Sequence, residues 1–148
     1  MRLVLYTPPK PLKRARHTVR GSYATSYYTA KDKAEMDTLR YAIINALTVE
    51  DKQLIAEHME NAQNGLKIAL KLMFTFSMPK SYSKKKKERL RNEAHTNKPD
   101  TDNLIKNVLD RGSGILWVDD KFIYKIEAVK VWGDVDKIEI EIDYERSE

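Results

Sequence analysis

A pair of aspartates two-thirds of the way along the chain has a spacing that suits metal chemistry. Asp100 and Asp102 lie in the segment KPDTDNLIK (98–106), in which Pro99 requires an extended backbone just before them. We therefore expect Asp100 directly before a helix and Asp102 in its first turn, where the helix dipole favours negative charge. Carboxylate oxygens are the ligands that Mg²⁺ and Mn²⁺ prefer. The pair could equally be an ordinary helix cap, and from these residues alone both interpretations stay open.

A lysine and a second acidic pair could complete such a site. Lys106 lies one turn after Asp102 on the predicted helix, where it could hold a phosphate or form an i,i+4 ion pair. Asp119 and Asp120 separate two apolar segments, and on their own they are typical of an acidic turn. Asp120 gains interest as a third metal ligand beside Asp100 and Asp102. Several carboxylates around one divalent ion suit the hydrolysis of a phosphodiester.

The charge distribution indicates a polyanionic partner. The 148-residue chain has a formal net charge of +5, but residues 1–100 hold 20 Lys and Arg against 10 Asp and Glu, whereas residues 101–148 hold 7 against 12. Basic surface supplies most of the sequence-independent affinity for nucleic acid, although charge runs are usually only solvated faces. The candidate DNA contacts are Lys13, Arg14, Arg16, Lys84, Lys85, Lys86, Lys87, Arg89, Arg91 and Lys98.

Composition excludes several other classes of protein. The chain has no cysteine, which rules out disulfides, thiolate metal sites and a cysteine nucleophile. It has no glycine-rich phosphate loop, which argues against a nucleoside triphosphatase. No apolar run approaches the roughly 18 residues that a membrane span needs. We therefore expect a soluble, cytoplasmic protein.

The apolar pattern predicts the elements that must position these residues. We expect one α+β domain over residues 1–148, with a small mixed β-sheet packed against helices. The predicted strands are 2–6, 66–76, 116–118, 122–131 and 138–144, with a hairpin around 20–22. The predicted helices are 30–47, capped by Thr29, then 49–61, 84–91 and 101–110.

Several aromatic residues have more than one interpretation. Tyr23, Tyr27 and Tyr28 could stack on unpaired DNA bases or simply pack within a strand. Trp117 is expected in the core. His95 is expected to be a surface histidine without a special role.

Taken together, the acidic segments resemble the signature of the RusA family of Holliday junction resolvases, in its phage and prophage type. The similar segments are 98–106, 109–110 and 117–120, together with parts of 11–29, the strand from residue 66, and 79–86. The resemblance implies a RusA-like fold, with catalytic and metal-binding acids at Asp100, Asp102 and Asp120 and a catalytic lysine at Lys106. Asp119 matches a further acid of less defined role.

The resemblance also implies an activity. Members of the family are homodimeric endonucleases that use Mg²⁺ or Mn²⁺ to hydrolyse phosphodiesters in four-way branched DNA. Paired symmetric nicks, leaving 5′-phosphate and 3′-hydroxyl ends, would resolve the junction during DNA recombination and repair. Such an enzyme is expected in the bacterial cytoplasm, at the nucleoid.

The chain departs from the family pattern at two places, and two other functions stay open. Phe122 stands where the family usually has glutamine, which removes a polar group near the expected metal. The segment 111–114 replaces the usual Ala-Leu-Asn-Gly, which alters the end of the helix. The alternatives are a non-catalytic branched-DNA-binding protein with structural acids, and a nuclease with the same metal site that prefers flaps or forks. Metal dependence separates the first alternative from the enzyme.

Overall fold

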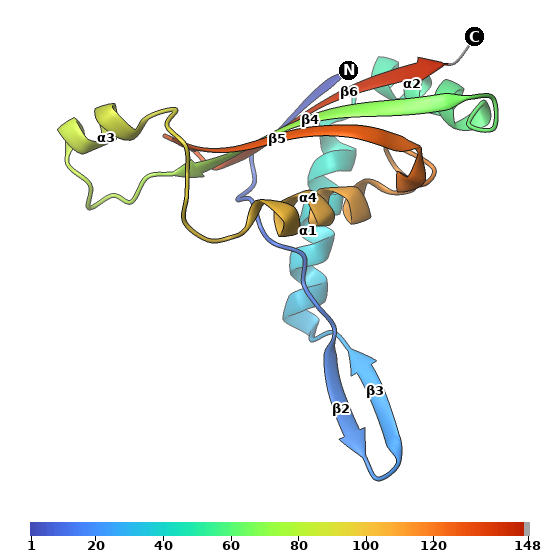
Figure 1. Cartoon of the computed structure of the whole chain (residues 1–148), viewed down its shortest axis with the longest axis horizontal. Coiled ribbons are helices and arrows are strands. Elements are labelled where there is room, and N and C mark those ends of the chain that lie inside the picture. The colour runs from blue at the N-terminus through green and yellow to red at the C-terminus, as the bar shows by residue number, and fades with distance from the viewer. Residues whose placement is uncertain (147–148) are drawn as a thin grey trace.

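A long central strand organises the protein. The computed structural model describes residues 1–146, in which β4 (Leu66–Ser77) pairs in parallel with β5 (Ile123–Gly133) and antiparallel with β6 (Lys137–Arg146) (Figure 1). β1 (Arg2–Leu5) adds antiparallel to β6, so the strand order is β1-β6-β4-β5. The prediction of a mixed sheet in an α+β domain is therefore confirmed.

The helices cover one face of this sheet. β4 alternates buried and exposed side chains, as its sequence predicts, and its buried side chains meet those of β6. Buried residues of α1 (Ala30–Ala46), α2 (Val49–Glu60) and α4 (Thr101–Gly112) pack against that face. The core includes Leu39, Ile43, Ile55, Ile68, Leu70, Phe74, Leu104, Val108, Ile138 and Ile140.

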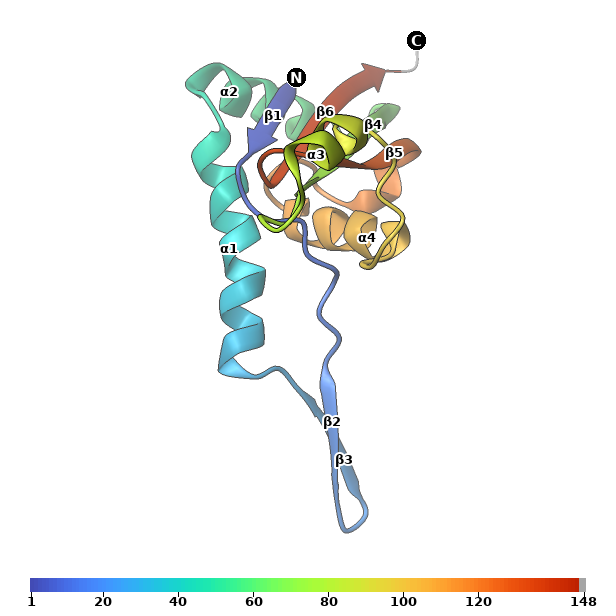
Figure 2. The ribbon, with the colours of Figure 1, turned by 90° about the vertical axis from the view of Figure 1, so that its left-hand side faces the viewer.

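Two smaller elements lie outside this core. β2 (Arg16–Arg20) and β3 (Tyr23–Tyr27) form a separate two-stranded hairpin that projects from the body in both ribbon views (Figures 1 and 2). The basic run forms the short helix α3 (Lys84–Leu90), capped by the side chain of Ser83 and without a buried residue. Both elements were predicted from the sequence.

The segment after α4 differs from the prediction. The expected strand 116–118 is wrong, because Leu116 and Trp117 are buried within a turn whose ladder contact is an isolated bridge between Ser113 and Trp117. The amide of Leu116 donates to the carbonyl of Gly112 and closes that turn. A single 3₁₀ turn, η1 (Asp120–Phe122), then precedes β5. The apolar residues here anchor a turn in the core. Because a buried strand is also rich in apolar residues, their composition alone resembled a strand.

The end of α4 depends on a close contact. Gly112 is the last helical residue, and a β-carbon there would lie 2.6 Å from Cζ2 and 2.9 Å from Cη2 of Trp117. Only glycine lets the indole ring lie directly against the helix. This contact gives Gly112, which lies within the departing segment 111–114, a packing role in this fold.

Gly112→Ala should therefore destabilise the protein. Alanine normally favours a helix over glycine by up to about 1 kcal/mol. Here the added methyl group overlaps the indole, and we expect a net loss of about 1–3 kcal/mol in the free energy of unfolding, measured with urea. The double variant Gly112→Ala/Trp117→Phe should lose less than the two single losses combined, because the smaller ring makes room. A single variant as stable as the wild type would contradict this packing.

Candidate active site and nucleic-acid interface

The first two acids lie at the start of α4, as predicted. Asp100 is the N-cap residue, in an extended conformation, and Asp102 follows in the first turn; both are exposed. The Asp100 side chain makes no capping hydrogen bond, whereas Asp102 Oδ1 accepts one from the backbone N–H of Asn103 at 2.9 Å. Asp100 therefore occupies the cap position without acting as a cap, which leaves its oxygens available to a ligand.

Lys106 lies one helical turn beyond Asp102 and is exposed. Within residues 1–146 neither side chain forms an ion pair, so the i,i+4 pair considered from the sequence is not made. Two unpaired carboxylates can bind a cation, and that cation can bind a phosphate. The unpaired lysine beside them can then contact the same phosphate directly.

A lysine that the sequence did not single out holds the loop before α4. Lys130 Nζ, on β5, donates to the carbonyl oxygens of Asn97 and Pro99 at 2.6 Å each. The backbone that carries Asp100 is therefore attached to the sheet. The Lys98–Pro99 peptide bond within this loop is cis. No local pattern marks Lys130, because its partners lie more than thirty residues away.

His95 also helps to attach the segment before α4 to the sheet, and its prediction as a surface residue is wrong. Its side chain is only 6% exposed and lies between Phe76 and Trp132, with ring centroids 4.1 and 4.4 Å away. Its backbone N–H donates to the carbonyl of Lys130, because residues 92–95 run along the edge of β5. Burial, and then the nearby Lys130 cation, lower the pKa of His95.

The N-terminal segment also contacts the first turns of α4. The backbone N–H of Leu12 donates to the carbonyl of Asn103 at 3.2 Å, and Asn107 Nδ2 donates to the carbonyl of Lys10 at 3.1 Å. Asn107 is buried, and it was missed although a polar residue on an apolar helix face is a detectable signal. The first turns of α4 are therefore held by both the N-terminal segment and β5.

The second acidic pair lies elsewhere in the chain. Asp119 Oδ1 accepts from the backbone N–H of Lys121 at 2.9 Å, so Asp119 caps η1. This capping contact agrees with the interpretation of Asp119 as part of an ordinary acidic turn. Asp120 is exposed and makes no ion pair among the described residues. Phe122, the departure from the family pattern, is half-buried against the core.

A single chain does not bring Asp120 to Asp100 and Asp102. Asp102 lies in the first turn of α4, whose 12 residues span about 18 Å, and Asp120 lies beyond the other end of the helix. Along the sheet, Asp100 lies near Lys130 and Asp120 lies before Ile123, seven residues or roughly 23 Å away. Figure 1 shows α4 running alongside β5, with the two acidic segments at its two ends. Across residues 1–146 no three acidic or histidine side chains gather to hold one metal ion.

The basic residues of α3 divide into anchors and free cations. Arg91, just after the helix, donates Nε and Nη2 to the carboxylate of Asp134 at 2.9 and 3.0 Å, which lowers the pKa of Asp134. Lys86 Nζ lies 3.7 Å from the centre of the Tyr82 ring. Of the remaining candidates, those exposed and outside any ion pair in the described part of the chain are Arg14, Lys84, Lys85, Arg89 and Lys98.

Two other candidates are paired with α1. Lys13 Nζ lies 2.9 Å from Glu35, and Arg16 Nε lies 3.6 Å from Asp32. Hydrogen bonding from Lys13 lowers the pKa of Glu35. The hydrogen bond from Thr29 lowers the pKa of Asp32, and Arg16 acts in the same direction. Lys13 and Arg16 therefore also fix the N-terminal segment to α1.

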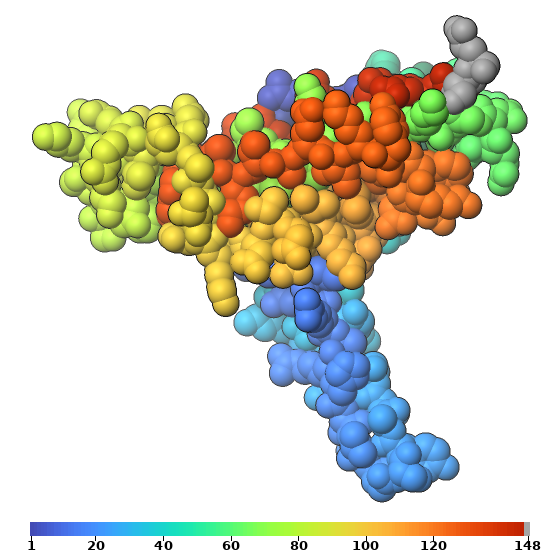
Figure 3. Space-filling model, in the orientation of Figure 1, coloured from blue at the N-terminus to red at the C-terminus, as the bar shows by residue number. Residues whose placement is uncertain are grey.

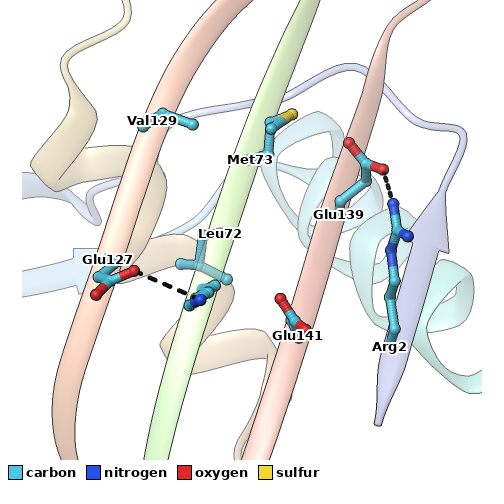
Figure 4. Close-up of a pocket in the computed structure, with 8 residues that line it drawn as sticks. Arg2, Leu72, Met73, Glu127, Val129, Glu139 and Glu141 are labelled. Carbon is cyan, nitrogen blue, oxygen red and sulfur yellow. Dashed lines mark hydrogen bonds and ion pairs between the residues drawn. The ribbon is translucent and has the colours of Figure 1, made fainter.

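The uncovered face of the sheet has a different character. A shallow hollow of about 250 Å³ lies there, far from α4, and carboxylates line much of it (Figure 4). Glu139 pairs with Arg2, Glu127 pairs with Lys71, and Glu141 points into the hollow. With three carboxylates against two paired cations, this surface offers a phosphate backbone less attraction than the basic elements do. The start of α4 instead lies between α3 and the base of the hairpin (Figure 1).

Exposed acids at a helix start, with a lysine one turn away and basic elements on two sides, form the kind of site that a nucleic-acid hydrolase needs. The family model of the endodeoxyribonuclease RusA matches residues 6–143, and the chain belongs to this family. It is therefore an endodeoxyribonuclease of the Holliday junction resolvase class, whose members depend on divalent metal. The family, the fold and the enzyme class predicted from the sequence are confirmed.

Two further results concern similarity to curated proteins and the length of the helices. A search of curated proteins found no significant match to the chain. Within residues 1–146, each helix is too short or too polar to cross a bilayer.

Burial of His95 predicts a pH-dependent stability. Its pKa in the folded protein lies below the unfolded value of about 6.5, so the unfolded chain binds the proton first. The stabilising contribution is complete above about pH 6.5 and is lost progressively as the pH falls below that value. In His95→Phe, urea unfolding should therefore depend less on pH between 7 and 5 than in the wild type.

His58 serves as the internal reference for this measurement. Burial lowers the pKa of His58 as well, and the group is present in both proteins. A residual pH dependence in His95→Phe is therefore expected. An identical dependence in the two proteins would show that His95 is not the group responsible.

Proposed function

We propose that this protein is a metal-dependent endonuclease that resolves four-way DNA junctions by paired nicks, with Asp100, Asp102 and Asp120 as metal ligands. The observation that carries the proposal is the state of Asp100 and Asp102. Both are exposed at the N-terminus of α4, and neither is neutralised by a cation of the described chain. Two uncompensated carboxylates beside basic elements need a cation before a phosphate can approach.

The donor set fits a hard divalent ion. Asp100 and Asp102 offer carboxylate oxygens, the ligands that Mg²⁺ and Mn²⁺ prefer, and the described residues supply no thiolate or imidazole there. When bound, such an ion neutralises the charge that builds up on the phosphate during hydrolysis. Lys106 would contact a non-bridging or leaving oxygen of the same phosphate, and the positive end of α4 favours the anion.

The position of Asp120 supports a site shared between two chains. Within residues 1–146 Asp120 does not gather with Asp100 and Asp102, because α4, about 18 Å long, runs between the two acidic segments, so a second copy of the chain would supply the third ligand. A two-fold dimer that placed two copies of α4 side by side and antiparallel would bring the start of one beside the end of the other. Each dimer would then hold two equivalent sites, as two symmetric cuts require.

The charge distribution supports one DNA-binding side. Free cations of α3 and of the N-terminal segment flank the start of α4, whereas the uncovered sheet face carries the carboxylates of β6. Branched DNA would therefore contact α3, α4 and the N-terminal segment and avoid the sheet. A protein that acts on such DNA would work at the nucleoid.

A cutting assay tests the activity and the two acids together. Asp102→Asn should reduce cutting of a labelled four-way junction by at least about a hundredfold, because it removes a metal ligand. Binding to the junction should persist or tighten, because a negative charge facing phosphate is lost. The assay compares Mg²⁺, Mn²⁺ and chelator, with a linear duplex as the control.

Three outcomes have distinct meanings. Metal-dependent paired nicks near the branch point support the resolvase proposal. Nicks that favour flaps or forks would support the alternative nuclease. Tight binding of the wild type without cutting under any metal would instead support a non-catalytic binder.

Mixing two inactive variants tests the shared site. In a mixed dimer of Asp102→Asn and Asp120→Asn, a site built from two chains leaves one intact combination, whereas a site within one chain leaves none. We expect each variant alone to be inactive and the mixture, after subunit exchange, to recover single nicks. As a control, a mixture of Asp100→Asn with Asp102→Asn should stay inactive, because these two acids come from the same chain. Inactivity of both mixtures, with exchange verified, would contradict the shared site.

A further inference from the structure

The β2–β3 hairpin has surface properties that folding does not explain. It projects from the body as a narrow extension (Figure 3), and its strands pair only with each other in the described chain. All of its strand residues except Thr18 are exposed. Large apolar or aromatic side chains are among them: Val19 is 70% exposed, Tyr23 77% and Tyr27 46%. These side chains contribute little to the core, although strand packing was one interpretation of the tyrosines.

The pairing register sorts the side chains of the hairpin onto two faces. Directly opposite pairs share a face, and alternate residues along a strand share it as well. One face therefore carries Arg16 with Tyr27, Thr18 with Thr25, and Arg20 with Tyr23, and we call it the Arg–Tyr face. The other face carries His17 with Ser26 and Val19 with Ala24. The cations and aromatic rings are thus gathered on one side.

The charge of this region selects a polyanion. Residues 13–28 contain four Lys and Arg and no Asp or Glu. Among residues 1–146, acidic partners meet the region only near its base, where Asp32 and Glu35 of α1 pair with Arg16 and Lys13. Arg20, at the tip, makes no ion pair within residues 1–146. The major groove of duplex DNA, about 12 Å wide, admits a two-stranded ribbon.

The base of the hairpin is attached to the candidate active site. The backbone bond from Leu12 to Asn103 fixes the start of this region to the first turn of α4. From Leu12 to Arg20 the chain can span at most about 27 Å. At a rise of about 3.4 Å per base pair, the tip can reach DNA up to roughly eight base pairs from the scissile phosphate.

We propose that the Arg–Tyr face binds the major groove of a duplex arm of the branched substrate, several base pairs from the cut. This contact rests on the proposed action on branched DNA and adds a second binding element to it. Arg20 contacts the backbone or a base edge, and Tyr23 packs its ring against the groove. The hairpin thereby fixes the direction of one arm relative to the start of α4.

Hydroxyl-radical footprinting on a long-armed four-way junction, in chelator so that no cutting occurs, tests this contact. Arg20→Gln/Tyr23→Ala should remove protection about five to eight base pairs along one arm while leaving protection at the branch point. Affinity for the junction should fall roughly tenfold, and the salt dependence of binding should lose about one phosphate contact. Val19→Ser, on the opposite face, is the matched control and should leave both measurements unchanged.

The possible results separate the two proposals. Circular dichroism and urea unfolding should be unchanged in both variants, because the hairpin lies outside the core. Loss of protection only at the branch point would overturn the arm contact and place the tyrosines on unpaired bases. If the wild type cuts junctions but Arg20→Gln/Tyr23→Ala leaves the footprint unchanged, the hairpin contact is overturned and the proposed function stands. A wild type that neither cuts nor prefers junctions would overturn the proposed function, and this contact with it.

Discussion

The parallel pairing of β4 with β5 is the constraint on which the rest of the structure depends. Two parallel strands cannot be joined by a tight turn, so the chain must return from the end of β4 to the start of β5. α4 makes that return and therefore runs in the direction opposite to the strands. The loop just before α4 therefore lies at one end of the sheet, and the turn just after it lies at the other. The separation of Asp100 and Asp102 from Asp120 follows directly from this topology.

The same return path explains how the charged side chains are used. The long connection before α4 must be fixed to the sheet, and cations do this where they meet backbone carbonyls or a carboxylate. Lys130 binds the carbonyls of Asn97 and Pro99, and Arg91 binds Asp134. These cations position the acidic loop and are less available to DNA. The exposed lysines of α3 and the unpaired arginines of the N-terminal segment are the ones left for phosphate.

Much of the fold could be predicted from the sequence, because its signals are local. The alternation of β4, the Thr29 cap of α1 and the extended backbone before Thr101 each depend on neighbouring residues. The segment 116–118 was misread because an apolar run in which Leu116 and Trp117 anchor a turn has the composition of a strand. His95 and Lys130 depend on contacts between distant segments, so no local pattern could reveal them. For the candidate site, the sequence predicted the positions of Asp100 and Asp102 at the start of α4, but it could not place Asp120, whose position is set by the crossover.

The placement of the acids at opposite ends of α4 has a consequence for control of the enzyme. If two chains supply one site, an isolated chain holds two incomplete halves and no complete one. Activity would then rise more steeply than the amount of protein whenever the chains are scarce, because association precedes chemistry.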